Sequence, residues 1–73
     1  MHLRQAREEA KKLVRPKMRI TFDIVDQNER LQHCWWIDPV AGTFQMKGNS
    51  GFCSIDDFNL NDPQVQNMKL EKV

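Results

Sequence analysis

Cysteine is scarce in this 73-residue chain, and no apolar run approaches the length of a membrane span. Two cysteines are too few for the disulfide framework of a secreted mini-protein. The apolar stretches fall short of the roughly 18 residues that would cross a bilayer, and no apolar segment follows the basic start as in a secretory signal. We therefore expect one small cytoplasmic domain without a membrane segment.

The residues that could bind a transition metal do not have the spacing of a metal site. Cys34, Cys53, His33 and His2 are the only soft ligands, and the sequence contains neither a Cys-x-x-Cys nor a His-x-x-x-His motif. His33 and Cys34 are neighbours on a predicted strand, so their side chains point apart. We expect buried free thiols, no metal and no cofactor.

No segment pairs a nucleophile with a base. Asp56 and Asp57 lie in a polar loop, where a cap or turn role is favoured over acid-base chemistry. The segment 48–51 lacks the lysine and following helix of a phosphate loop, so we predict a hairpin turn. Because so small a domain cannot enclose a substrate pocket of several hundred cubic ångströms, we predict a binding protein that is not an enzyme.

Charge is divided unevenly along the chain, although the net charge is only +1. Residues 1–19 carry seven basic and two acidic side chains, whereas residues 20–73 carry four basic and eight acidic ones. Such a layout offers a basic arm to nucleic acid or to an acidic surface. The alternative is a solvated helix whose charges only keep the domain soluble. The basic arm consists of Arg4, Arg7, Lys11, Lys12, Arg15 and Lys17.

A short helix is predicted from Leu3 to Val14, because good helix formers fill this segment and Pro16 ends it. Its apolar stripe is thin and is expected to dock only weakly. The stripe consists of Leu3, Ala6, Ala10 and Leu13. We expect residues 1–17 to form a basic helical arm, mobile over its first 14 residues until a partner orders it, and residues 18–73 to form a β domain.

A two-residue period that begins at Met18 indicates strands. The predicted fold is α+β: a small antiparallel sheet of four to five hairpin-connected strands in a meander, with the short N-terminal helix. The predicted strands are Met18–Val25, Arg30–Ile37, Thr43–Lys47, Phe52–Ile55 and a last strand, Val65–Val73.

Two reversals of the chain place apolar side chains on one face of the middle strands. The first pairs Trp36 with Phe44 and Cys34 with Met46, and the second pairs Phe44 with Ile55. Together they predict a core face formed by Cys34, Trp36, Phe44, Met46, Cys53 and Ile55.

The first hairpin has two possible registers. A four-residue loop aligns Phe22 with His33, and a five-residue loop aligns Phe22 with Cys34. The register decides whether Trp35 or Trp36 is buried, because neighbours on a strand point to opposite faces. The outward indole would stack on a base, anchor a protein partner or be covered by the N-terminal helix.

The strand Met18–Val25 is predicted to form a sheet edge to which a partner segment adds as another strand. Arg19 and Asp23 would alternatively protect that edge from aggregation. The predicted partner contacts are Arg19, Ile20, Thr21, Phe22, Asp23, Trp35 and Trp36.

Three segments carry a resemblance to a known class of proteins: the basic arm LRQAREEAKKLVRPK, the strand MRITFDIV and the motif CWWID. With them the chain resembles small early proteins of lytic phages that bind host bacterial RNA polymerase. The resemblance implies displacement of the sigma factor, which blocks initiation. It also implies antitermination near the RNA exit channel together with the host factor NusA. Contacts with the polymerase β′ N-terminus and β flap, and a monomer in the infected bacterial cytoplasm, are further implications.

A single-stranded RNA- or DNA-binding β module is the alternative function, with Trp35 or Trp36 as a stacking platform. The acidic body of the chain counts against this alternative. An inhibitor of another host defence protein would share every feature described above, and only a partner assay separates it.

Overall fold

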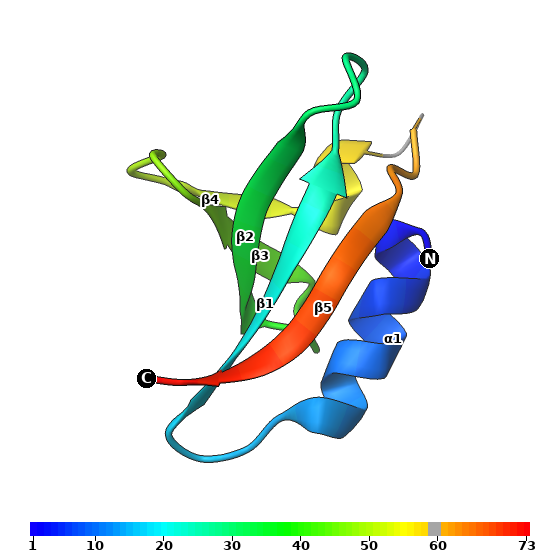
Figure 1. Ribbon diagram of the computed structural model, residues 1–73. Helices are drawn as coiled ribbons and strands as arrows, with labels where there is room; N and C mark the ends of the chain where they lie inside the picture. The colour runs from blue at the N-terminus through cyan, green and yellow to red at the C-terminus, as the bar shows by residue number, and fades with distance from the viewer. Residues whose placement is uncertain (59–60) are drawn as a thin grey trace.

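The computed structural model describes residues 1–58 and 61–73. One helix, α1 (Leu3–Leu13), packs on one face of a five-stranded antiparallel sheet (Figure 1). The sheet has the order β4-β3-β2-β1-β5, so the predicted α+β fold with a hairpin-connected sheet is confirmed. A 3-10 helix, η1 (Ile55–Phe58), follows β4. The strands are β1 (Met18–Val25), β2 (Leu31–Asp38), β3 (Thr43–Met46), β4 (Phe52–Ser54) and β5 (Val65–Lys72).

The alternation on β1 sets the two faces of the sheet. Ile20, Phe22 and Ile24 point to the helix side and are buried, because apolar residues recur at every second position. Phe22 stacks on Trp36, with ring centroids 4.8 Å apart, and meets Phe44 edge to face at 5.6 Å. These rings form the centre of the core.

The first hairpin has the five-residue register, with Phe22 opposite Cys34. Asp26 stabilises the turn, because its Oδ1 accepts hydrogen bonds from the backbone N–H groups of Asn28 and Arg30, at 2.8 and 2.9 Å. Trp36 is therefore the buried indole, only 6% exposed, and Trp35 lies on the other face.

The second hairpin pairs Trp36 with Phe44, as the sequence predicted. The third hairpin differs: Phe44 lies opposite Cys53 and not Ile55. The strand ends earlier than predicted because the chain turns into η1 at Ile55, whose side chain still enters the core. All six predicted core residues nevertheless belong to the hydrophobic core or pack against it.

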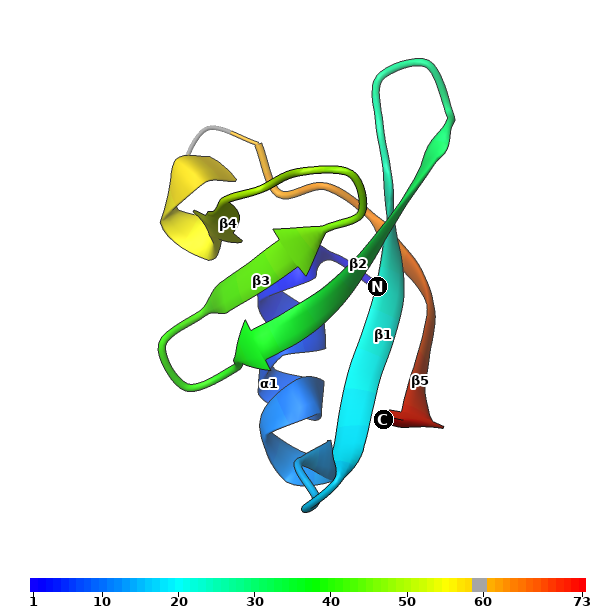
Figure 2. The same cartoon turned by 90° about the vertical axis from the view of Figure 1, so that its left-hand side faces the viewer.

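Helix α1 belongs to the same core as the sheet, contrary to the expectation of a weakly docked, mobile arm. Leu3, Ala6 and Ala10 are at most 1% exposed. The two alanines bring the helix close to the sheet, because they have no bulk to hold it away. Figure 2 shows α1 running behind β2 and β3 and alongside β1.

Backbone and side-chain hydrogen bonds hold α1 at its start and along its length. At its start, the N–H of Leu3 donates to the carbonyl of Pro63 (2.9 Å), and the N–H of Arg4 donates to Oδ1 of Asp62 (3.2 Å). These contacts satisfy donors that a helix leaves open at its first turn. Further along, Arg7 donates to the carbonyl oxygens of the β2–β3 turn, through Nε to Pro39 (2.8 Å) and through Nη2 to Val40.

The prediction that Met18–Val25 forms a sheet edge is wrong. This strand lies between β2 and β5, so its backbone groups are paired on both sides. The edges of the sheet are β4 and β5. Lys69, Glu71 and a register shift protect the β5 edge against pairing with other chains. Within residues 1–58 and 61–73, no helix has the length and apolar character of a membrane span.

Candidate partner-binding surface

The sheet face turned away from α1 forms the candidate site, and we call it the outer face. Residues directly opposite one another on antiparallel strands share a face. The register therefore places one row across all five strands. That row consists of Lys69, Thr21, Trp35, Gln45 and Phe52.

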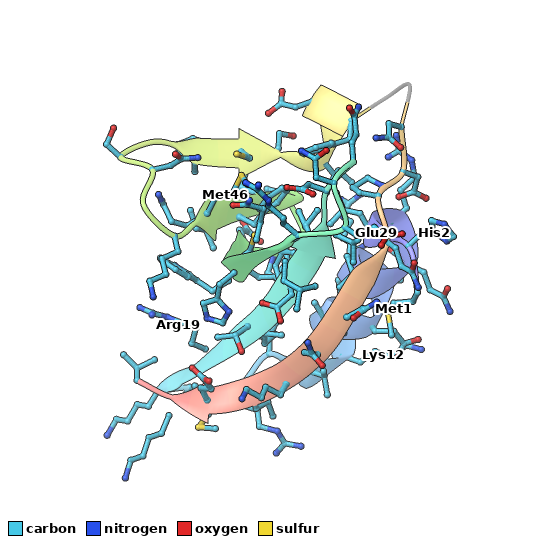
Figure 3. All side chains as sticks on the ribbon, turned by 45° about the horizontal axis from the view of Figure 1, so that its top comes forward. Met1, His2, Lys12, Arg19, Glu29 and Met46 are labelled. Atoms are coloured by element: carbon cyan, nitrogen blue, oxygen red, sulfur yellow. The ribbon has the colours of Figure 1, made fainter. Side chains whose placement is uncertain are left out.

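Trp35 lies at the centre of this row and is partly covered by Arg19. The Arg19 guanidinium carbon is 4.8 Å from the centroid of the Trp35 ring, a cation-π contact. The His33 ring lies nearby on the same strand, with its centroid 6.4 Å from that of Trp35. Figure 3 shows Arg19 extending from the sheet on the side away from α1, whose Lys12 is labelled.

Two large apolar side chains of the sheet are exposed. Phe52 ends the row on β4 and is 67% exposed, and Ile37 near the end of β2 is 52% exposed. Aromatic and arginine side chains with apolar neighbours are the residue types enriched at the centres of protein interfaces. Sequence reasoning missed both residues, although the alternation on the predicted strand 52–55 already turns Phe52 away from the face of the core residue Cys53.

Asp23 links three strands of the outer face. Its Oδ1 lies 3.0 Å from Nδ1 of His33 on β2, and its Oδ2 accepts a hydrogen bond of 2.9 Å from Nδ2 of Asn67 on β5. Partial burial raises the pKa of the Asp23 carboxyl, but the hydrogen bonds from Asn67 and His33 outweigh it and leave that pKa below its usual value. Asp23 is thus a structural group that also flanks the site.

Four of the seven predicted partner contacts are inaccessible. Ile20, Phe22 and Trp36 belong to the core, and Thr21 is 1% exposed although it lies on the outer face. Ile20, Phe22 and Trp36 are inaccessible because they lie in the core shared with α1, and no segment can add to β1 because it is a central strand. Of the predicted set, Arg19, Asp23 and Trp35 reach the surface.

Two buried polar atoms within the described part of the chain have no hydrogen-bond partner: Oγ1 of Thr21 and Nε1 of Trp36. The Thr21 hydroxyl lies on the outer face, opposite Trp35. An unpaired buried polar group costs about 1–3 kcal/mol.

The predicted basic arm is only partly available for an anionic partner. Lys11 pairs with Glu8 at 2.8 Å and Lys12 with Glu9 at 3.8 Å, both one turn back along α1. The hydrogen bond from Lys11 is the main cause that lowers the pKa of Glu8. Arg7 is bound to the β2–β3 turn. Most of the helical cations are thus engaged within the protein.

Four other cations gather at one end of the sheet, which we call the basic end. The pairing of β1 with β5 sets Lys72 opposite Met18, and the N–H of Val73 donates to the carbonyl of Lys17 (3.2 Å). The basic end consists of the exposed residues Arg15, Lys17, Arg19 and Lys72. Sequence reasoning missed Lys72, because the partner of the last strand was not identified.

Acidic side chains gather at the opposite end of the sheet. Figure 1 shows the β1–β2 turn and η1 at this end, and the α1–β1 connection at the other. The acidic residues of the turn, of η1 and of the connection that follows it are Asp26, Glu29, Asp56, Asp57 and Asp62. The charge asymmetry of the sequence is therefore also a separation in space.

Both cysteines are free thiols. Cys34 is buried, and burial, followed by the charge of Cys53, raises the pKa of its thiol to about 12. Its Sγ donates to the carbonyl of Gln32 (3.3 Å). In the described ranges, no group of three or more histidine, cysteine or acidic side chains could hold a metal ion.

A pocket of about 220 Å³ opens beside the β1–β2 turn. Ile24, Met46, Phe58 and Pro63 give it an apolar lining, and Asp26 is its one carboxylate among the described residues. The oxygen of Asp26 already accepts the hydrogen bonds of the turn. Among the described residues that line the pocket, no second titratable side chain accompanies Asp26.

No protein-family model, no curated protein and no solved structure matches the chain.

Proposed function

We propose that this chain is a phage-type transcription regulator that binds host RNA polymerase. It inhibits sigma-dependent initiation and promotes antitermination by protein-protein contact. The proposal rests on the resemblance of the basic arm, the MRITFDIV strand and the CWWID motif, and on the surface that these segments form once folded. The partners that follow from the resemblance are the polymerase β′ N-terminus, the β flap and NusA.

The observation that carries the proposal is the cation-π pair of Arg19 and Trp35 on the outer face, which also carries the exposed Phe52. The guanidinium lies 4.8 Å from the indole centroid, and Phe52 at the end of the same face is 67% exposed. A partner that covers this face buries an aromatic and an arginine together, the combination that dominates interface energies. Binding thus uses the face of the sheet and not an added strand.

The test is to mix the protein with bacterial RNA polymerase holoenzyme and to separate the mixture by size-exclusion chromatography. We expect co-elution with the core enzyme and release of sigma. Phe52→Ala should weaken co-elution at least tenfold, whereas Val40→Ala should not, because Val40 is equally exposed (68%) but lies outside the outer face, in the β2–β3 turn. Elution of the wild-type protein alone, with polymerases from several hosts, would overturn the proposal.

A further inference from the structure

The cations of the basic end come from three parts of the chain that the fold brings together. Arg15 and Lys17 lie in the α1–β1 connection, Arg19 lies near the start of β1, and Lys72 ends β5. The opposed pair Met18 and Lys72 fixes their proximity. The positive patch therefore exists only in the folded protein, because its cations come from separate parts of the chain.

The acidic side chains of β5 and α1 are already engaged. Glu71 pairs with Lys69 at 3.5 Å, and Glu8 and Glu9 pair with the helical lysines. Among the residues that the structure describes, Arg15, Lys17 and Lys72 have no ion pair. Their charge is therefore directed to solvent and to any anion that approaches.

Lys17 occupies a backbone conformation that lysine seldom adopts. Its φ is 63°, in the left-handed region where glycine meets no steric cost. The chain thus has a cation at a position where glycine would fit without strain. This feature allows the charge to be removed without loss of stability.

Arg19 joins the basic end to an aromatic surface. Its guanidinium lies over Trp35, and a guanidinium plane is itself a surface on which nucleobases stack. Proteins that bind single strands combine a positively charged track for the phosphates with planar groups for the bases. A duplex keeps its base faces covered and would use only the charges.

From this arrangement we infer that the basic end binds the phosphates of single-stranded RNA, with one base stacked on the Arg19–Trp35 pair. This function goes beyond polymerase binding and does not require it, but both use the Arg19–Trp35 pair, so the two partners compete for that pair. The acidic end of the protein repels RNA, so the RNA approaches the protein at the basic end. Lys17, Arg15 and Lys72 contact the phosphates of the RNA, and this contact is independent of base sequence.

The test measures binding of a fluorescein-labelled 12-mer of oligouridine by fluorescence anisotropy, without polymerase, at several KCl concentrations. For three to four neutralised phosphates, the slope of log K against log salt should be about −2 to −3. The variant K17G/K72Q should weaken binding at least tenfold. It removes two phosphate contacts, so the magnitude of the slope should fall by about 1.4, or about 0.7 for each contact. Its thermal midpoint should not fall, since glycine in place of Lys17 relieves the left-handed φ.

The matched control is R30Q/K47Q, which removes the same charge from exposed positions outside the basic end. It should change affinity less than threefold. Arg19→Lys keeps the charge but removes the guanidinium plane, so it should weaken binding to RNA while leaving the salt slope unchanged.

Three results would overturn the inference: no binding of oligouridine in 20 mM KCl, equal losses in K17G/K72Q and R30Q/K47Q, or equal affinity for a hairpin duplex. Equal competition by polyglutamate of the same charge would also overturn it, since it would mean a general site for acidic polymers. Because polymerase is absent from every arm, these results leave the co-elution experiment to decide the proposed function separately.

Discussion

Asn67 and Asp23 are 44 residues apart in sequence, yet Nδ2 of Asn67 donates a hydrogen bond of 2.9 Å to Oδ2 of Asp23. The contact lies where the pairing of β1 with β5 shifts register, and Asn67 has a φ of 59° there. An asparagine tolerates this left-handed conformation better than most residues, and its amide closes the irregularity. Asp23 thereby connects the last strand to the first hairpin.

This contact predicts that acid weakens the fold through Asp23. Because the folded pKa lies below the unfolded one, the stabilisation is complete at neutral pH and disappears as pH falls from about 4 through the folded pKa. Its size should be about 1 kcal/mol. Urea unfolding of wild type and Asp23→Asn at pH 7 and pH 2.5 measures it. Equal acid dependence in both proteins would assign the effect to other carboxyls, such as Asp26.

The contacts of Arg7 predict that it acts structurally and is not an RNA or polymerase ligand. Arg7→Ala removes both hydrogen bonds from α1 to the β2–β3 turn and should lower the free energy of unfolding by about 1.5–3 kcal/mol. Gln5→Ala, at an exposed position of the same helix, should change it by less than about 0.5 kcal/mol. Urea denaturation compares the two. Unchanged stability in Arg7→Ala would contradict this structural role and would favour the original prediction that Arg7 binds an anionic partner.

Close packing of α1 on the sheet predicts that Ala10 tolerates no larger side chain. Ala10→Leu adds volume at a fully buried position and should destabilise the protein by about 1–3 kcal/mol. Gln5→Leu adds an apolar side chain at an exposed position and is the control. Thermal denaturation followed by circular dichroism measures both. If Ala10→Leu is as stable as wild type, the helix does not pack as described.

The helix shows how far sequence reasoning reaches. Its limits were predicted to within one residue and its apolar stripe correctly, but not its docking. The prediction weighed the hydrophobicity of the stripe, which is low because two of its residues are alanines. Packing depends instead on fit: Ala6 and Ala10 are small enough for the helix to lie directly on the sheet, and both are 0% exposed. A hydrophobicity pattern does not show that a small side chain allows two elements to pack closely.

The sheet shows a second limit. Alternation located β1 to within a residue and identified the core residues of the middle strands, because a two-residue period is local. The partner of Val65–Lys72 is not a local property, so the closing strand was predicted without its position beside β1. Two errors in the site follow from this: β1 was expected at an edge, and Lys72 was not connected with Lys17.

The two cysteines should differ in reactivity. Burial raises the pKa of the Cys34 thiol to about 12, so almost no thiolate forms at pH 8. Cys53 is half-buried, and its pKa is raised by burial and by Asp57. Titration with a disulfide reagent should modify Cys53 slowly and Cys34 only after unfolding. Mass spectrometry of the modified peptides identifies the sites, and faster labelling of Cys34 would contradict its burial.

The five-residue first turn predicts distinct environments for the two tryptophans. Trp36 is 6% exposed between Phe22 and Phe44, whereas Trp35 lies on the outer face under Arg19. Trp35→Phe leaves only Trp36, which should emit at shorter wavelength and resist acrylamide quenching. Trp36→Phe leaves only Trp35, which should be quenched several times more efficiently, with circular dichroism confirming that the variant is folded. The opposite result would require the four-residue turn, because one step of register exchanges the two faces of β2.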